Sequence, residues 1–313
     1  MALKIAMVIP PAVDLNTPYA AAPRLAGWLR HLGHTVVSID ASLEIFLRVF
    51  SPAGLERMFA AIDPGDLTND YRGVYQNRDR YVQIIDDAVA VLQHRDMAAI
   101  YRITGRKWLP EGPHFRRRDV AESRSNAGAW SHGDLARHYV SLMIADLTET
   151  FRSTISKHFG VHRYAHSLGY SPPSFDRLEA ELQRPPNVYE QMMFELAEEL
   201  FPKDLDLVCL TCPFPGNVMG SLLLGKWFGA NRPGVKRALG GGFPSTELRE
   251  LSDPRVFDYL DYVVLDDGEL PLRQICARLE GRDEPLHNTF VREFGKVSFH
   301  KSDLPAIPFE TYP

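Results

Sequence analysis

The sequence predicts an α/β protein built on a doubly wound parallel β-sheet. Three short apolar runs, Leu207–Thr211, Val235–Leu239 and Tyr262–Leu265, each end at a cluster of glycine, proline or acidic residues, and a helix-like segment follows each run. Runs bounded in this way are typical of buried parallel strands. Because ligands bind outside the carboxyl ends of such strands, the loops after the three runs are the candidate binding loops.

A β-α-β unit opens the chain. Lys4–Ile9 is an apolar run that ends at two prolines, Pro18–Leu32 carries apolar residues at helical spacing, and Thr35–Ile39 is a second run after a glycine. The chain contains neither GxGxxG nor GxxxxGK[ST], so it lacks both the dinucleotide fingerprint and a P-loop. We expect residues 1–41 and 202–284 to form one discontinuous Rossmann-like domain.

Between residues 42 and 201 the pattern becomes helical. An insertion of this length far exceeds an ordinary connection between two strands, so we expect an all-helical subdomain. Its candidate helices are Leu43–Val49, Pro52–Ile62, Arg80–Gln93, Gly133–His158, Phe175–Gln183 and Val188–Leu200.

The last segment, residues 285–313, predicts a β-hairpin and a proline-rich linker. Within Thr289–His300, two alternating runs flank a Phe294-Gly295 turn, which is the pattern of a hairpin. Pro305, Pro308 and Pro313 exclude regular structure in the tail.

Composition limits the function classes. The chain has 313 residues, of which 45% are hydrophobic and 24% charged, with a net charge of −5. This balance argues against a nucleic-acid binder that acts through bulk positive charge. No apolar run approaches the ~20 residues of a membrane helix, so we expect no membrane segment and a cytoplasmic location. Cys209 and Cys212 have CxxC spacing but no further ligands nearby, which predicts structural thiols rather than a metal site.

Several motifs in this order resemble the amino-terminal, cobalamin (B12)-binding half of B12-binding radical SAM proteins. The resemblance covers residues 3–40 and 205–313; the helical insertion matches nothing. The motifs that carry it are Pro10-Pro11 before Asn16-Thr17-Pro18-Tyr19, Gly240-Gly241-Gly242, the turn Asp266-Asp267-Gly268-Glu269 where the family often shows GEGE, and the hairpin followed by Leu304-Pro305-Ala306-Ile307-Pro308.

The resemblance implies a flavodoxin-like sheet with the corrin ring of cobalamin across the carboxyl edge. Glycines would let the backbone approach the flat macrocycle, and backbone N–H groups and hydroxyls would bind its amide arms and phosphate. The residues expected to contact the cofactor are Asn16, Thr17, Pro213, Phe214, Asn217, Gly240, Gly241, Gly242, Phe243, Ser245, Thr246, Asp267, Gly268 and Glu269.

Two departures from known motifs shape the functional hypothesis. The DxHxxG motif is absent, so cobalamin is expected to bind without a histidine from that motif. The CxxxCxxC motif is also absent, so the resemblance places the [4Fe–4S] cluster and S-adenosylmethionine in a carboxy-terminal barrel beyond this chain. We therefore expect the cobalamin-binding module of a B12-dependent methyltransferase or related radical enzyme, with no catalytic residue here and an unknown substrate. The chain is expected to be part of a longer enzyme; the alternative is a stand-alone relative that lost the barrel.

The sequence leaves two other functions open. The first is a cofactor-free α/β scaffold whose helical insertion binds a protein or peptide. The second is an enzyme in its own right, such as a nucleotide or sugar transferase, in which Asp266, Asp267 and Glu269 hold a divalent cation. The same acidic residues would also suit a helix amino terminus, and the triple glycine would suit a tight turn.

Overall fold

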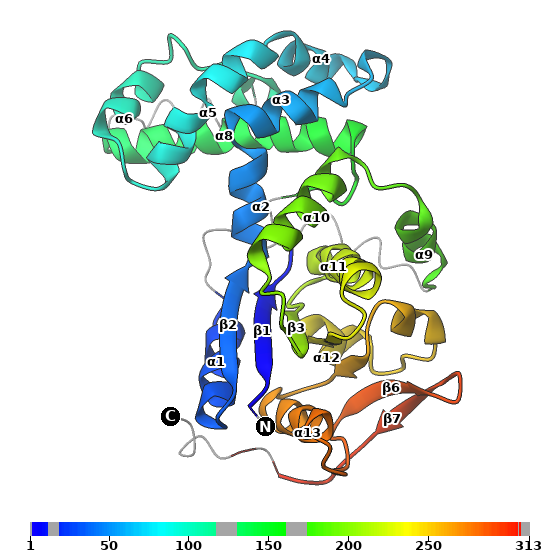
Figure 1. The fold of residues 1–313 in the computed structure, drawn as a ribbon. Coiled ribbons are helices and arrows are strands. Elements are labelled where there is room, and N and C mark those ends of the chain that lie inside the picture. The colour runs from blue at the N-terminus through cyan, green and yellow to red at the C-terminus, as the bar shows by residue number, and fades with distance from the viewer. Residues whose placement is uncertain (1, 12–18, 117–129, 161–173, 306, 308–313) are drawn as a thin grey trace. The chain divides into compact units, whose positions relative to one another are not determined.

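A computed structural model describes residues 2–11, 19–116, 130–160, 174–305 and 307 (Figure 1). The chain divides into two compact units. The sheet unit comprises Met1–Glu44, Val161–Pro185 and Met193–Pro313, and the helical unit comprises Ile45–Gly160 and Pro186–Met192. Two parts of the expected helical insertion, on either side of residues 186–192, thus belong to the sheet unit.

The sheet unit contains a seven-stranded mixed sheet in the order β2-β1-β3-β4-β5-β6-β7. The strands from β2 to β5 in this order are parallel, whereas β6 is antiparallel to β5 and β7 to β6. The expected α/β class is confirmed, and the hairpin extends the sheet. The strands are β1 (Lys4–Ile9), β2 (Thr35–Asp40), β3 (Leu207–Thr211), β4 (Lys236–Gly240), β5 (Tyr262–Val264), β6 (Thr289–Glu293) and β7 (Lys296–His300).

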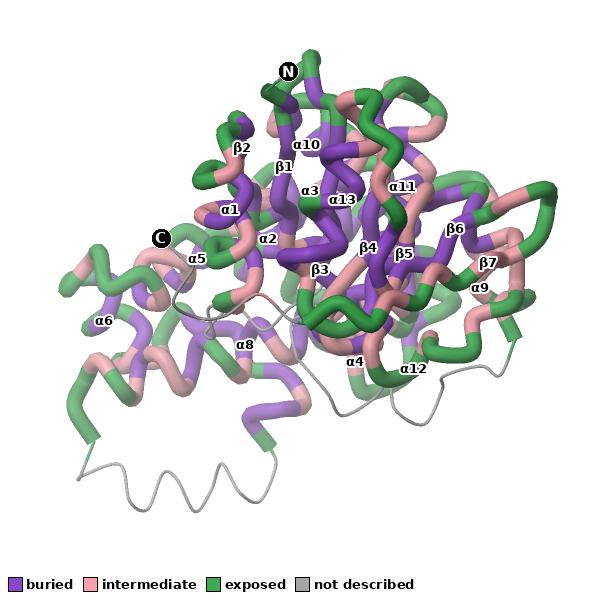
Figure 2. The backbone as a smooth tube through the Cα atoms, turned by 90° about the horizontal axis from the view of Figure 1, so that it is seen from below, coloured by how far each residue is buried: buried purple, intermediate pink, exposed green. Residues whose placement is uncertain are grey.

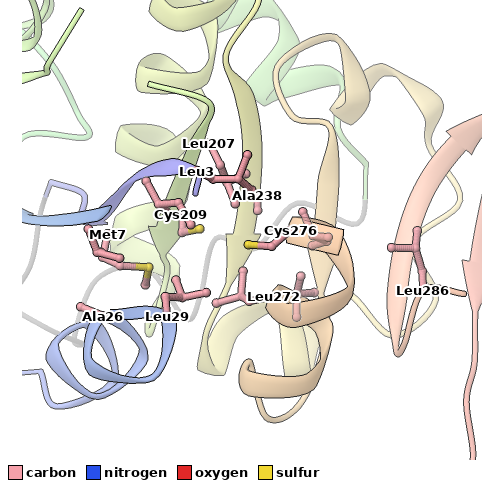
Figure 3. Packing of buried hydrophobic residues seen from close by; sticks show 14 of the residues in the cluster. Leu3, Met7, Ala26, Leu29, Leu207, Cys209, Ala238, Leu272, Cys276 and Leu286 are labelled. Atoms are coloured by element: carbon pink, nitrogen blue, oxygen red, sulfur yellow. The ribbon is translucent and has the colours of Figure 1, made fainter. Parts of the chain in front are cut away.

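Helices α1 (Ala21–His31) and α13 (Glu269–Leu279) cover one face of this sheet. Figure 3 shows side chains from both helices, among them Leu29 and Leu272, gathered against residues of the strands. Strand residues that face the other side of the sheet are buried as well, so β1 and β3 are buried along almost their whole length (Figure 2). Burial of both faces explains why these strands appear in the sequence as continuous apolar runs.

The remaining helices of the sheet unit include α11 (Val218–Asn231) and α12 (Gly242–Glu247), which contact β4. α9 (Asp176–Gln183) packs against α11. Short 3₁₀ turns cover Pro215–Asn217 and Pro254–Asp258.

The helical unit is organised around α8 (His132–Thr154), whose Phe151 packs edge-on against Phe59 and Phe159. Asp146 of α8 is fully buried, and its carboxylate accepts hydrogen bonds from the backbone amides of Gly112 and His114. The other helices are α3 (Pro52–Ala60), α4 (Asn69–Gln76), α5 (Arg78–Leu92) and α6 (Met97–Thr104), with 3₁₀ turns at Pro64–Asp66 and Pro113–Arg116.

Two helices, α2 (Ala41–Val49) and α10 (Val188–Leu200), have residues in both units. Across the described ranges, no helix combines the length and the apolar character needed to cross a bilayer.

Candidate functional site

The candidate site lies at the carboxyl edge of the parallel strands, where the loops after β1, β3 and β4 meet. The side-chain amide of Asn217, at the start of α11, donates to the carbonyl oxygen of Pro10 at 2.9 Å. A Cβ on Gly220 would lie 1.9 Å from the carbonyl oxygen of Pro11, so α11 begins against the backbone that follows β1. In a sheet of order 2-1-3-4-5, the junction of β1 and β3 is the topological switch point at which ligands bind.

Asn217 is directed into this junction rather than outward. Its side chain is fully buried, and its Oδ1 finds no hydrogen-bond partner in the part of the chain that the structure describes. One amide N–H of Asn217 is thus engaged by Pro10, and the expected contact of this residue with a ligand stays a prediction.

Glycines let the loops after β3 and β4 pack backbone against backbone. Gly241 has a φ of 111°, and a Cβ there would lie 2.7 Å from the carbonyl oxygen of Cys212. A Cβ on Gly242 would lie 2.9 Å from that of Pro213. Backbone hydrogen bonds from Cys212 to Gly240 (2.7 Å) and from Phe243 to Cys212 (3.1 Å) join the loops. This close approach alone requires glycine at 241 and 242.

An aromatic pair flanks the same loops. The rings of Tyr19 and Phe214 meet edge-on with centroids 6.4 Å apart, and both residues are half-buried. Burial and the Cys212 thiol raise the pKa of Tyr19, while a backbone hydrogen bond from Gly242 opposes the rise. Tyr19 is not among the contacts that the sequence predicts; its position just before α1, in the motif that follows β1, is the signal that could identify it.

The hydroxyls of α12 bond within the protein. Ser245 Oγ donates to the Gly241 carbonyl at 2.9 Å and accepts from the Asp266 amide at 2.8 Å. Thr246 Oγ1 donates to the Gly242 carbonyl at 3.0 Å. Ser245 thus ties the loop after β4 to the end of β5, and neither hydroxyl needs a ligand to be satisfied.

Glu269 is buried and paired with α1. It is 3% exposed, its Oε1 lies 2.9 Å from Nε of Arg24, and its carbonyl accepts from the Trp28 indole at 3.2 Å. The adjacent Gly268 packs on Leu25, whose Cδ1 would lie 3.1 Å from an added Cβ. These contacts fasten the start of α13 to α1.

Asp266 instead binds the neighbouring loops. It adopts a φ of 61°, forms an ion pair with Arg249 and accepts from Asn288 Nδ2 at 3.3 Å. Asp267 is exposed. Because Glu269 is buried elsewhere, these carboxylates do not converge, and no cluster of three His, Cys, Asp or Glu side chains suited to a metal occurs in the described ranges.

His287, just before β6, was not anticipated from the sequence. It is 8% exposed, its Nδ1 has no hydrogen-bond partner within the described chain, and burial lowers its pKa. Nothing in the local sequence marks it, because its position at this edge depends on the pairing of β6 with β5.

The cysteines are buried and form no disulfide. Cys209 of β3 and Cys276 of α13 point toward one another in the core (Figure 3). Burial raises the pKa of both Cys276 and Cys212 to about 12. A raised pKa keeps these thiols protonated at neutral pH, and the thiolate is the form that binds metals and reacts with oxidants.

The other expected contacts differ in accessibility. Pro213 and Phe243 are buried, Gly240, Gly241 and Gly242 are half-buried, and Thr246 is exposed. Asn16 and Thr17 lie outside the described residues.

Comparison with protein-family models, with curated proteins and with solved structures gives no match for this chain.

Proposed function

We propose that this chain is a cobalamin-binding module, with the cofactor held at the carboxyl edge of the sheet, next to Pro10 and Pro11 and against the loops after β3 and β4. The observation that carries the proposal is the placement of Phe214, Gly241 and Gly242 at the switch point of a sheet whose parallel strands run in the order 2-1-3-4-5. Crevices at such points bind ligands in doubly wound proteins.

The chemistry of these loops suits a neutral macrocycle. The described residues 10–11, 19, 212–217 and 240–245 include no charged side chain. They offer backbone groups and two half-buried aromatic rings, which match the flat ring and amide arms of a corrin. A nucleotide pyrophosphate is less suited, because it requires cations or a glycine-rich helix amino terminus.

Cobalamin, when bound, would supply methyl-transfer or radical chemistry, and this chain would supply binding and orientation. Phe214 and Tyr19 would contact the ring, and the backbone at Gly240–Gly242 would allow its close approach. In the family that the sequence resembles, the [4Fe–4S] cluster and S-adenosylmethionine belong to another domain. We therefore assign no reaction step to a residue of this chain.

One observation favours the alternative of a cofactor-free scaffold. Asn217, Ser245, Thr246 and Glu269 are each engaged in internal contacts, so part of the expected cofactor-binding set already has a structural role. This alternative predicts that the chain binds no corrin.

A reconstitution experiment separates the two. The purified chain is incubated with hydroxocobalamin and desalted, and the retained corrin is measured by its visible absorbance. About one equivalent is expected for the wild type. Phe214→Ala should weaken binding at least about tenfold through the lost aromatic contact, whereas Phe299→Ala, a matched change on the half-exposed edge strand β7, should not.

A colourless wild-type protein would overturn the proposal in favour of the scaffold. Equal retention by both phenylalanine variants would overturn the location at the carboxyl edge of the sheet. Circular dichroism of each variant shows whether the fold is intact.

A further inference from the structure

We propose that the open edge of the sheet is a self-association surface, at which β7 pairs antiparallel with β7 of a second copy of this chain. Among the residues that the structure describes, β7 is the last strand of the sheet. An edge strand presents unpaired backbone N–H and C=O groups that suit another extended strand. The partner at this edge is therefore a β-strand, and the residues of β7 indicate that it is β7 of a second copy.

The hairpin geometry determines which groups face outward. Phe294 and Gly295 form a two-residue turn, both with positive φ, so Glu293 and Lys296 are the pair that closes it. Hydrogen-bonded and non-hydrogen-bonded pairs alternate from that point. Val297 and Phe299 therefore direct their N–H and C=O groups to the open edge.

If two copies are related by a two-fold axis through Ser298, all of these outward N–H and C=O groups form hydrogen bonds between the copies. This axis places Val297 opposite Phe299 of the second copy, and Phe299 opposite the second copy's Val297, so that each pair exchanges two backbone hydrogen bonds. Lys296 comes opposite His300, so within the strand neither two lysines nor two carboxylates face one another. The register pairs the apolar residues with one another and the polar residues with one another.

The apolar side chains at this edge remain incompletely covered within one copy. Phe299 stacks on Phe290 with centroids 4.4 Å apart, yet it is 41% exposed. In the two-fold register its open side receives Val297 of the second copy, an aromatic and β-branched pair that stabilises antiparallel strands.

The turn supports an intermolecular role. Phe294 is fully exposed and has a φ of 50°, a strained conformation for a bulky side chain at a position that favours asparagine or glycine. Burial within this chain does not compensate for that strain. A contact at the end of a continued sheet would give the ring a partner.

Cysteine cross-linking tests the register directly. Ser298 faces its own copy across the proposed axis in a non-hydrogen-bonded pair, where Cα atoms are about 4.5 Å apart, within disulfide range. Under mild oxidation Ser298→Cys should form a covalent dimer. Lys296→Cys, two residues away on the same face, should not, because it faces His300. The native cysteines are buried in both variants.

Sedimentation velocity over a wide concentration range provides the second measurement. The wild type should approach twice the monomer mass at high concentration. Val297→Pro, which removes an outward N–H at an edge that tolerates proline, should weaken dimerisation at least about tenfold. Val297→Thr keeps that N–H and should dimerise like the wild type.

A wild type that stays monomeric at every concentration would overturn the proposal. So would a dimer that Val297→Pro leaves unchanged and Ser298→Cys fails to cross-link, since its interface would lie elsewhere. If Val297→Pro does not fold, the comparison of the two cysteine variants decides.

Discussion

Asn217 and Pro10 are 207 residues apart in the chain, yet the Asn217 side-chain amide donates to the Pro10 carbonyl at 2.9 Å. The contact joins the end of β1 to the start of α11 in a fully buried position. It connects the two segments of the discontinuous sheet unit at the switch point where the candidate site lies. The contact adds a buried side-chain bond to the parallel pairing of β1 with β3.

Replacing Asn217 with alanine should lower the free energy of unfolding by about 1–3 kcal/mol, because the Pro10 carbonyl would lose its buried donor. Urea denaturation measures the change. Asn231→Ala is the matched control, since Asn231 Nδ2 also bonds a carbonyl of α11 at 2.9 Å but the residue is exposed. Equal effects of the two substitutions would contradict a special role for the Asn217 contact.

Gly241→Ala should destabilise the protein by at least about 2 kcal/mol, since it combines a left-handed backbone conformation with a clash against Cys212. Gly234→Ala is the control: an added Cβ there has nothing within 4 Å, so stability should stay the same or rise slightly. Thermal unfolding of the two variants provides the comparison. A stable Gly241→Ala protein would show that the loop can rearrange.

Apolar runs alone predicted most of the sheet. β1 and β3 have the predicted bounds, and β4 is displaced by one residue, because strands buried on both faces appear as continuous apolar segments. Two helices, α4 and α6, were not predicted. α4 buries only Val74, so it leaves too weak a periodic signal to be distinguished from a polar connection.

The location of the candidate site was predictable, but the roles of its residues were not. Turn residues after the strands identify the carboxyl edge. The sequence does not determine whether the Ser245 hydroxyl donates to a ligand or to the backbone carbonyl four residues earlier, because it allows both hydrogen bonds. Glu269 pairs with Arg24 from a distant part of the chain. Such long-range partners are set by packing rather than by sequence neighbours.

The ion pair of Glu269 and Arg24 predicts a structural rather than a ligand-binding role for this glutamate. Arg24→Ala would leave a carboxylate that is 3% exposed without this partner. Breaking a fully buried ion pair costs about 3–5 kcal/mol; because Arg24 is half-exposed, we expect a smaller destabilisation of about 2–3 kcal/mol. The exposed Lys203→Ala is the control for loss of a positive charge. Urea denaturation provides the values.

The same pair offers a test of the expected cofactor contact. Glu269→Gln keeps the side-chain shape and an acceptor for Arg24, so cobalamin retention should equal that of the wild type. Loss of corrin with unchanged unfolding would restore Glu269 to the cofactor-binding set.

Asp261 gives the sheet unit a defined sensitivity to acid. Its Oδ2 accepts from Nε of Arg237 at 2.8 Å and its Oδ1 from Nζ of Lys236 at 3.0 Å. Burial raises the pKa of Asp261, but the bonds and charges of Arg237 and Lys236 outweigh it, so that the pKa lies below its usual value.

The pKa of an aspartate in an unfolded chain is about 3.9. Because the pKa of Asp261 is lower in the folded state, the unfolded state binds more protons than the folded state in the acid range. The stabilisation from Asp261 is therefore complete above about pH 4 and is lost as the pH falls through the folded-state pKa.

Asp261→Asn should lower stability by about 1–2 kcal/mol at neutral pH and by progressively less in acid. Urea denaturation from neutral pH to about pH 3 would follow this convergence. Asp258→Asn, which removes a half-exposed partner of Arg292, is the control. Parallel stability curves for Asp261→Asn and the wild type throughout this range would contradict the assignment.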